Sequence, residues 1–409
     1  MDYHVILLGG GLAYTGAELL RKAGLRVAIV EKDPSHLGGV CLHRGCVPTK
    51  LYLFEARKAY DLKNSSLLSV KDYSFSLKGL KEKKEKLTKG LRDQIERLLK
   101  GVDFIYGYGE LVEPHVVEVE GKGRISAEHI IINTGKSYPL EPNGDHLLDL
   151  EEVPESLKIA GDDPLALEFA CMFALMEARV ELYFEEGSLD FMHPSIKGRL
   201  LKMLKEMGIV VKPFSEAPKE GTYWIKKRVP NTQCIKVALS TDELGHILVD
   251  KNYETSLRDH YAVGDVNGIA ELAHASRIQS LSVAKRIITG QGFFTPPYKI
   301  PYVLYTQPLS YAKVGLTKGE LERRGIEFSE KSVSLRALAV GSIYHTEEGM
   351  VFLYFDKKGF LLGAEVFSRD AGEVIGNLTV SLFSELNLDM LSRLCLPHPT
   401  LGETVFIRL

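Results

Sequence analysis

The chain has 409 residues, of which 45% are hydrophobic and 26% are charged, and its formal net charge at pH 7 is −3. A chain of this length and composition can bury several cores, so two or three domains are expected. The nearly balanced charge gives no indication of a nucleic-acid or anionic-membrane partner. No cationic segment precedes an apolar run at the N-terminus, so neither a signal peptide nor a membrane span is expected.

The N-terminal residues predict a dinucleotide-binding βαβ unit. A strand-like run leads into Gly9-Gly10-Gly11, a helix follows, and a second strand ends at Glu31. This order seats the pyrophosphate of a dinucleotide on a helix N-terminus and its ribose on a carboxylate. At strict spacing the third glycine of the motif is Tyr14, and Ala13 or Gly16 would then supply the close contact between helix and strand.

The five cysteines comprise one local pair, Cys41 and Cys46, and three that are scattered singly. This count fits a catalytic disulfide in a reducing cytoplasm better than a secreted scaffold. A regular helix would hold the Cα atoms of residues five apart at ~8.6 Å, beyond the reach of a disulfide, so the chain must bend there if the thiols are to join. Gly45, Gly38 and Gly39 permit the bend. Spacing alone leaves unrelated core thiols and half of a metal site as alternatives, although no second cysteine pair would complete a zinc site.

Periodicity predicts elements further along the chain. From Lys78 the sequence reads as a lysine-rich amphipathic helix, whose charges are expected to form a solvated surface. Its apolar face is made by Leu87, Leu91, Ile95 and Leu98. Residues 350–355 and 361–366 read as antiparallel strands, and residues 371–391 read as helical.

Four motifs in a fixed order resemble those of the flavin-dependent pyridine nucleotide-disulfide oxidoreductases, which include dihydrolipoamide dehydrogenase, glutathione reductase and mercuric reductase. The window from Cys41 to Lys50 is similar to their active-site segment. Thr134-Gly135 and Tyr261–Asp265 are similar to their flavin-binding motifs, and Leu272-Ala273-His274 follows at the family's distance. His398 to Glu403 most closely resembles the ending of dihydrolipoamide dehydrogenases.

The resemblance implies an α/β flavoprotein with two dinucleotide-binding domains and a C-terminal α+β dimerisation domain. Residues 1–145 and 255–295 would form the FAD-binding domain, 146–254 a shortened NAD(P)-type central domain, and 296–409 the interface domain. The implied cofactor is FAD, and the implied assembly is a homodimer located in the cytoplasm.

The resemblance also implies the site residues. Cys41 and Cys46 would form the redox-active disulfide. His398, held by Glu403 and supplied by the other subunit, would move the proton, since only a thiolate attacks a disulfide and an imidazole can accept and return the thiol proton. The implied pair beside the flavin N5 is Lys50 with Glu168. The implied cofactor-binding residues are Gly9, Gly11, Glu31, Gly39, Lys50, Gly109, Thr134, Gly135, Asp265 and Ala273; no metal site is expected.

The central domain departs from the resemblance. Where relatives carry a second Gly-x-Gly-x-x-Gly for NAD(P), this chain has Gly161-Asp162-Asp163-Pro164-Leu165-Ala166, so Asp163 replaces the glycine that lets the pyrophosphate approach. Asp163 suits an N-cap and Pro164 the first helical turn, so a carboxylate is expected on the helix N-terminus. From Met207 to Thr232 there are too few residues for the strands of relatives. A diverged but working nicotinamide site is the alternative.

These features favour an FAD-dependent dithiol–disulfide oxidoreductase that passes electrons between a dithiol and flavin, without the usual NAD(P) binding. The favoured dithiol is dihydrolipoamide, free or on a lipoyl protein. Cys41 would exchange with the substrate, and Cys46 would lie against the flavin. One alternative is an ordinary NAD-linked dihydrolipoamide dehydrogenase. Another is a non-catalytic flavoprotein subunit that binds a lipoyl or complex partner, but the intact Cys41, Cys46, His398 and Glu403 argue against it.

Overall fold

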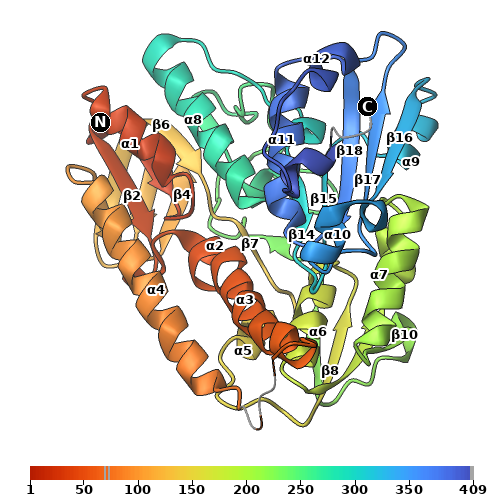
Figure 1. The fold of residues 1–409 in the computed structure, drawn as a ribbon. Helices are drawn as coiled ribbons and strands as arrows, with labels where there is room; N and C mark the ends of the chain where they lie inside the picture. The colour runs from red at the N-terminus through yellow and green to blue at the C-terminus, as the bar shows by residue number, and fades with distance from the viewer. Residues whose placement is uncertain (69–70, 72–73, 406–409) are drawn as a thin grey trace. The chain divides into compact units, whose positions relative to one another are not determined.

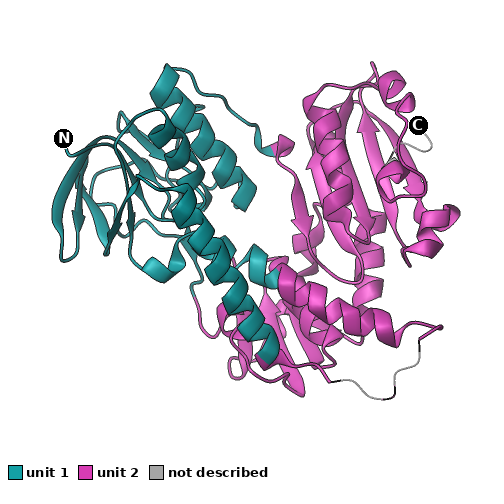
Figure 2. Cartoon of the chain, turned by 60° about the vertical axis from the view of Figure 1, so that its left-hand side comes forward, with its two compact units in different colours: residues 1–49, 79–139, 228–297 teal, residues 50–78, 140–227, 298–409 magenta. Residues whose placement is uncertain are grey.

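The computed structural model of the chain describes residues 1–68, 71 and 74–405 (Figure 1). The chain forms two compact units (Figure 2). Unit 1 comprises Met1–Thr49, Gly79–Pro139 and Arg228–Pro297. Unit 2 comprises Lys50–Lys78, Leu140–Lys227 and the described residues from Tyr298 onward. Among the described residues, no helix has the length and apolarity needed to cross a bilayer.

Unit 1 is built on a parallel sheet in the order β3-β2-β1-β6, with β13 paired to the other edge of β6. Its strands are β1 (Tyr3–Leu8), β2 (Val27–Glu31), β3 (Asp103–Tyr106), β6 (Gly123–Ile132) and β13 (His260–Ala262). The first half of β6 also pairs in antiparallel fashion with β5 (Val116–Val119), which pairs with β4 (Gly109–Glu113). The register Leu8↔Val30 and Leu8↔Ile132 brings the carboxyl ends of the central strands to one edge. Parallel α/β sheets bind ligands at that edge.

The continuous apolar sequence of β1 reflects burial on both faces of this sheet. Val5 and Leu7 pack with Ala17 of α1 (Tyr14–Lys22) and Val283 of α8 (Ala273–Thr289). On the opposite face, Ile6 and Leu8 pack with Leu111 and Val117 of the antiparallel strands. Both faces of the sheet are therefore covered.

Gly16 serves helix–helix packing in this unit. A Cβ atom at Gly16 would lie 2.7 Å from the backbone oxygen of Ser280, so the missing side chain lets α1 approach α8. At Gly16 the close contact is thus between two helices, and not between a helix and a strand as expected.

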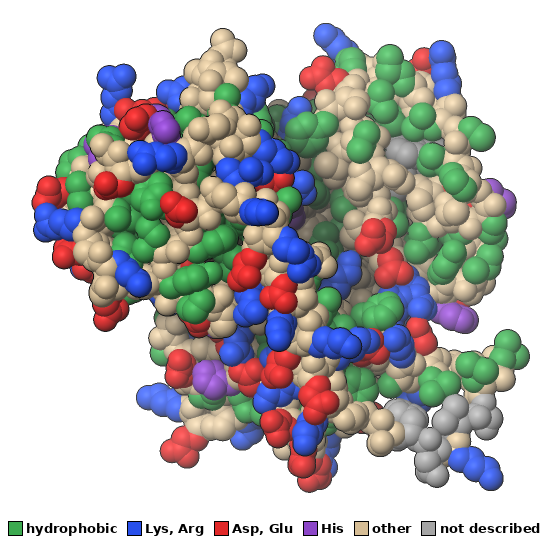
Figure 3. Space-filling model, turned by 90° about the vertical axis from the view of Figure 1, so that its left-hand side faces the viewer, with side chains coloured by type: hydrophobic (Ala, Val, Ile, Leu, Met, Phe, Trp, Pro, Cys, Tyr) green, Lys and Arg blue, Asp and Glu red, His purple; other side chains and the backbone are tan. Residues whose placement is uncertain are grey.

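The lysine-rich helix is present as α4 (Leu77–Leu98). Leu91 and Ile95 pack on the core of unit 1, as expected, whereas Leu87 and Leu98 are exposed. Figure 3 shows basic and acidic side chains intermixed on the face in view.

Residues 228–254, which the sequence analysis assigns to the central domain, belong to unit 1. β12 (Val229–Pro230) pairs with β7 (Lys136–Ser137), and the N–H of Leu111 donates to the carbonyl of Cys234. Ile247 and Tyr253 are buried in the cores of this unit. The chain therefore returns to unit 1 at Arg228, because its apolar side chains and backbone bonds are satisfied there.

Unit 2 contains a four-stranded parallel sheet in the order β10-β9-β8-β11. Its strands are β8 (Ser156–Gly161), β9 (Arg179–Phe184), β10 (Val210–Pro213) and β11 (Thr222–Ile225), and its helices are α6 (Leu165–Leu175) and α7 (Pro194–Glu206). Between β10 and β11 the chain forms one short 3-10 turn, Phe214–Glu216. No strand lies between β10 and β11 in this described part of the chain. Unit 2 also includes α5 (Gly144–Leu147) and most of α3 (Cys46–Lys63).

The second sheet of unit 2 is antiparallel, in the order β14-β15-β18-β17-β16. Its strands are β14 (Tyr302–Leu304), β15 (Ser310–Gly315), β16 (Ser329–Ser334), β17 (Met350–Phe355) and β18 (Leu361–Ser368), and its helices are α9 (Lys318–Arg323), α10 (Ala339–Ile343), α11 (Ala371–Phe383) and α12 (Leu388–Ser392). The antiparallel strands predicted at 350–355 and 361–366 are confirmed. The helix predicted over 371–391 is interrupted, because Glu385 takes a left-handed conformation (φ 52°) and Asn387 caps a new helix through the N–H of Met390.

A buried carboxylate joins α7 to the antiparallel sheet of unit 2. Glu365 of β18 is fully buried and accepts hydrogen bonds from the hydroxyls of Tyr311 (2.9 Å) and Tyr354 (2.8 Å). It also accepts one from the backbone N–H of His193 (2.7 Å), the residue that caps α7. Burial raises the pKa of Glu365. Three donors converge on one carboxylate, so this contact fixes α7 against the antiparallel sheet.

Candidate active site

Cys41 and Cys46 lie on two different helices that follow one another closely in the sequence. α2 (Gly39–His43) ends after His43, and α3 begins at Cys46. A Cβ atom at Gly45 would lie 3.0 Å from the carbonyl oxygen of Val40, so this glycine lets the chain fold back closely between the helices. The bend expected at Gly45 is therefore present. All five cysteines carry free thiols in this structure.

The two thiols differ in acidity. A hydrogen bond from the Cys41 thiol lowers the pKa of Cys46 to about 7, aided by the positive charge of Arg228, while burial and Asp265 oppose the shift. Donating that hydrogen bond, together with burial, raises the pKa of Cys41. Cys46 also stands at the N-terminus of α3, where the helix favours an anion. Of the two thiols in the reduced pair, Cys46 is therefore the one that ionises first.

This difference predicts how the reduced protein responds to pH. The Cys46 pKa is lowered, so the thiolate is present above pH 7 and is lost as the pH falls through about 7. A thiolate-to-flavin charge-transfer absorbance should disappear over the same range. Arg228, whose guanidinium lies 4.4 Å from the Tyr138 ring centroid, supplies part of the stabilisation.

The variant Arg228→Met should move the midpoint of that titration to higher pH, because a positive charge near the thiolate is lost. Arg258→Met removes an arginine whose side chain is 92% exposed in the same unit and serves as the control. An unchanged midpoint in Arg228→Met would show that Arg228 does not set the acidity of Cys46.

The residues expected to hold FAD follow the carboxyl ends of the strands of unit 1. Gly9 follows β1, Glu31 ends β2, Thr134 follows β6 and Asp265 follows β13. The charge of Asp265 acts on both Cys41 and Cys46, which places the thiols near the same edge. A dinucleotide along this edge would therefore lie beside the cysteine pair.

Local packing at this edge fits a dinucleotide. Gly9 has φ 106°, and a Cβ atom there would lie 2.4 Å from the carbonyl oxygen of Asn133. A Cβ atom at Gly39 would lie 2.9 Å from Cα of Gly11, so the glycine loop and α2 are in close contact. The buried hydroxyl of Thr134 has no hydrogen-bond partner among the described residues. A close backbone cradle with an unsatisfied hydroxyl fits a bound polar ligand.

Two further residues of the cofactor set have structural contacts of their own. Glu31 accepts hydrogen bonds from the N–H groups of Gly10 (2.7 Å) and Asp33 (3.1 Å), which fixes its carboxylate at the end of β2. A Cβ atom at Gly109 would lie 2.5 Å from Cγ1 of Val30. Gly109 therefore serves strand packing in this structure. Ala273 is the first residue of α8.

Asn133 organises the edge and was missed by sequence reasoning. Its side-chain oxygen accepts from the N–H of Ala13 (3.2 Å), and its amide donates to the carbonyl of Val263 (2.9 Å). One buried amide thus joins the glycine loop to the turn that carries Asp265. The signal in the sequence was a polar amide directly before Thr134-Gly135, at the end of an apolar strand.

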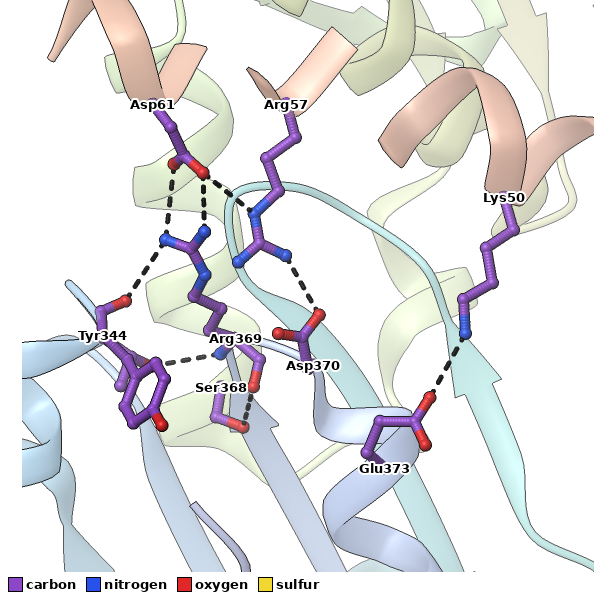
Figure 4. A network of polar contacts seen from close by, with 9 residues as sticks. Lys50, Arg57, Asp61, Tyr344, Ser368, Arg369, Asp370 and Glu373 are labelled. Atoms are coloured by element: carbon purple, nitrogen blue, oxygen red, sulfur yellow. Dashed lines mark hydrogen bonds and ion pairs between the residues drawn. The ribbon is translucent and has the colours of Figure 1, made fainter. Parts of the chain in front are cut away.

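Lys50 has a different partner from the one expected. Its ammonium lies 3.4 Å from Glu373 of α11 and 4.9 Å from the centroid of the Tyr305 ring. The buried Glu168 accepts a hydrogen bond from the backbone N–H of Tyr305 (2.8 Å). Both side chains therefore meet at Tyr305, but the ion pair of Lys50 is made with Glu373 (Figure 4).

The rest of α3 is fixed to the antiparallel sheet by two arginines (Figure 4). Arg57 is buried and bonds to Asp370 (3.0 Å), and Arg369 bonds to Asp61 (2.6 Å). Each pair joins α3 to the segment between β18 and α11. This network holds the helix that begins at Cys46 against the C-terminal sheet of unit 2.

His398 and Glu403 are paired as expected. Nδ1 of His398 lies 3.0 Å and 3.1 Å from the two carboxylate oxygens of Glu403. The side chain of Glu403 is 11% exposed and that of His398 is 69% exposed, so a fixed carboxylate orients an accessible imidazole. A cavity of about 330 Å³ lies beside this loop, lined by α11 residues including Glu373 and by Thr400. The geometry leaves Nε2 of His398 available for proton transfer.

The N-terminus of α6 carries the carboxylate that the sequence predicts. Oδ1 of Asp163 accepts a hydrogen bond from the N–H of Leu165 (2.9 Å), and α6 begins at that residue. Oδ1 of Asp162 accepts one from the N–H of Lys227 (2.9 Å). Two carboxylates thus occupy the turn where the second dinucleotide motif would bind a pyrophosphate.

Sequence comparison gives the family. Residues 3–219 match the pyridine nucleotide-disulphide oxidoreductase family, and residues 300–406 match its dimerisation domain. The chain is 27% identical over 452 residues to dihydrolipoyl dehydrogenase from Buchnera aphidicola subsp. Baizongia pistaciae, covering 99% of this chain and 94% of the relative. It is 29% identical over 458 residues to dihydrolipoyl dehydrogenase 2 from Haloarcula marismortui, covering 98% and 94%.

Solved structures share the fold. The HOCl-induced flavoprotein disulfide reductase RclA from Escherichia coli superposes with a TM-score of 0.86 at 23% identity, covering 98% of both chains. LpdA from Mycobacterium tuberculosis superposes with a TM-score of 0.90 at 19% identity, covering 98% of this chain and 97% of LpdA. At these identities the likeness concerns the fold.

A dinucleotide-binding sheet with two unequal thiols at its carboxyl edge defines a thiol oxidoreductase of the flavoprotein class. The chain belongs to the pyridine nucleotide-disulphide oxidoreductase family. Within that family it resembles dihydrolipoyl dehydrogenases, and it is an FAD-dependent disulfide oxidoreductase that carries the family's dimerisation domain.

Proposed function

We propose that this enzyme passes electrons between a lipoyl-type dithiol and FAD through a Cys41–Cys46 disulfide. The observation that carries the proposal is the close turn at Gly45 between α2 and α3, which brings Cys41 and Cys46 together at the carboxyl edge of the sheet of unit 1. A thiolate at Cys46 is suited to donate electrons to a neighbouring flavin, and Cys41, whose pKa is raised, is suited to take a proton when it leaves the mixed disulfide. The likeness to dihydrolipoyl dehydrogenases favours dihydrolipoamide, free or on a lipoyl protein.

The exchange begins when a substrate thiolate attacks Sγ of Cys41 and breaks the Cys41–Cys46 bond. The second substrate thiolate then attacks the mixed disulfide, so the substrate leaves as a disulfide and Cys41 leaves as a thiolate. His398, oriented by Glu403, takes the proton of the first substrate thiol and returns it to Cys41 when Cys41 leaves, and the proton of the second thiol is released to solvent. Bound FAD supplies the two-electron acceptor for the reduced pair.

In this proposal FAD is held at the carboxyl edge of unit 1 by the glycine loop, Glu31, Thr134-Gly135, Asp265 and the start of α8. Lys50 and Glu168 complete the proposed catalytic set, and Lys50 is paired to Glu373. The dimerisation domain supports a homodimer, in which His398 would act on the partner's cysteine pair.

We further propose that the flavin does not exchange electrons with NAD(P) in the usual way. The observation that supports this is the bond from Leu165 to Asp163 at the N-terminus of α6, together with the short connection between β10 and β11. The first alternative, an ordinary NAD-linked dihydrolipoamide dehydrogenase, requires phosphate to displace that carboxylate. The second, a non-catalytic flavoprotein subunit, gives no reason for two unequal thiols.

Anaerobic stopped-flow reduction tests the function. Dihydrolipoamide should reduce the flavin of the wild-type protein and produce a thiolate-to-flavin charge-transfer band. Cys46→Ser should abolish the band, whereas Cys395→Ser, which removes an exposed cysteine elsewhere, should leave it unchanged. A flavin that stays oxidised in the wild type would support the non-catalytic subunit. A normal band in Cys46→Ser would exclude Cys46 as the flavin-side thiol.

A further inference from the structure

Four titratable side chains of unit 1 form a chain that no step above uses. Nζ of Lys136 lies 2.7 Å from Oε1 of Glu271 and 3.0 Å from Nε2 of His246. Nδ1 of His246 lies 2.7 Å from Oδ2 of Asp242. Lys136 is 5% exposed and His246 is 6% exposed, whereas the side chain of Glu271 is 45% exposed. A buried cation is thus held between a histidine and a partly exposed carboxylate.

The hydrogen bonds define the charges in this cluster. An ammonium can only donate, so Nε2 of His246 accepts from Lys136, and the histidine proton is on Nδ1. That proton is donated to Asp242. The charge of Lys136 is balanced by the carboxylate of Glu271, 2.7 Å away. A buried lysine keeps its charge only with such partners.

The cluster lies where the segments assigned to FAD meet. Lys136 directly follows Thr134-Gly135, and Glu271 precedes the start of α8. A Cβ atom at Gly268, three residues after Asp265, would lie 2.6 Å from the His246 ring, so this ring packs against the turn that carries Asp265. Lys136 lowers and Glu271 raises the pKa of Asp265, although burial is the main cause of its raised pKa. Both charges therefore act on the flavin edge.

We propose that the Lys136–Glu271 ion pair tunes the reduction potential of the bound FAD. The proposal rests on the assignment of FAD to this edge. Reduction by the dithiol adds two electrons to the flavin; of the two thiol protons, one joins the flavin and one is released, so the reduced flavin carries an added negative charge. A nearby cation stabilises that charge and a nearby carboxylate opposes it. Lys136 thus favours reduced FAD, and Glu271 limits the effect.

The two members of the pair should therefore act with opposite sign. The variant Lys136→Met leaves Glu271 without its cation and should shift the equilibrium toward oxidised flavin by at least about tenfold, or about 30 mV for a two-electron couple. The variant Glu271→Gln leaves Lys136 without its carboxylate and should shift the equilibrium toward reduced flavin. A merely structural role of the pair would not reverse the sign.

The experiment is an anaerobic titration of the holoenzyme with dithionite in the presence of a reference redox dye. A second ion pair in unit 1 provides matched controls: Lys236 and Glu110 lie 3.0 Å apart, and neither belongs to the cofactor set. Lys236→Met and Glu110→Gln should leave the potential unchanged. Shifts of the same sign in the two test variants, or no shift in either, would overturn the proposal. Glu271→Gln alone decides the sign if Lys136→Met does not fold.

The titration does not depend on the proposed substrate. Dithionite reduces the flavin directly, so the potentials can be measured even if dihydrolipoamide fails to reduce it. Failure with dihydrolipoamide but opposite shifts in the two variants would refute the proposed function and keep the tuning role. Normal reduction by dihydrolipoamide with unshifted potentials would refute the tuning role and keep the proposed function.

Discussion

NADH and NADPH at micromolar concentrations should reduce the flavin about 10²–10³-fold more slowly than expected for an intact nicotinamide site, because Asp163 opposes the pyrophosphate. Like charges ~4 Å apart cost ~4 kcal/mol at an effective dielectric of 20, which corresponds to about 10³ in affinity. The carboxylate of Asp163 is bonded to the N–H of Leu165, the kind of group that would otherwise bind phosphate. Stopped-flow absorbance with NADH and with dihydrolipoamide measures both rates on one preparation.

The variant Asp163→Gly distinguishes the effect of the Asp163 carboxylate from the effect of the short connection between β10 and β11. It should increase the NADH rate by about tenfold and not restore it fully, because Asp162 and the short connection between β10 and β11 remain. Asp190→Gly, which removes an exposed carboxylate from the same unit, should have no effect. Rapid reduction of the unmodified protein by micromolar NADH would refute the loss of the site and make this an ordinary NAD-linked dihydrolipoamide dehydrogenase.

His398→Ala should slow dithiol–disulfide exchange by about 10²–10⁴-fold, the usual contribution of a positioned acid–base group. Nδ1 of His398 is held by Glu403, so Nε2 is the atom that exchanges the proton. FAD content should stay near that of the wild type, because His398 is exposed and belongs to unit 2, whereas the residues proposed to hold FAD belong to unit 1. His4→Ala serves as the control. Exchange within twofold of wild type in His398→Ala would exclude this histidine as the base.

A mixed dimer tests whether the base comes from the other subunit. Each of the variants Cys46→Ser and His398→Ala should be inactive alone. When they are mixed and allowed to reassociate, a heterodimer has one site that combines an intact cysteine pair with an intact histidine from its partner. About one quarter of wild-type activity should return with random pairing of twofold dimers. No recovery, despite heterodimer formation shown by mass spectrometry, would place the base in the same chain.

Several features of the site follow from the sequence because they depend on short spacings. The glycine at position 45 predicts the break between α2 and α3, since a continuous helix cannot bring residues five apart together. The resemblance of the segment from His398 to Glu403 to the ending of dihydrolipoamide dehydrogenases implies the pairing of these two side chains, and they are hydrogen-bonded. Asp163 before Pro164 predicts the carboxylate on α6, because capping involves only neighbouring residues.

Tertiary structure decided the partners of side chains that are far apart in sequence. Lys50 of α3 meets Glu373 of α11 at a separation of 323 residues, and no local pattern encodes that pairing. Asn133 joins two loops 120 and 130 residues away, and Lys136 finds Glu271 at a separation of 135. Local propensity fixes helices, turns and caps within a few residues. Which distant charges are brought together depends on how the helices and sheets pack, so the sequence determined the reacting groups and the packing determined their electrostatic surroundings.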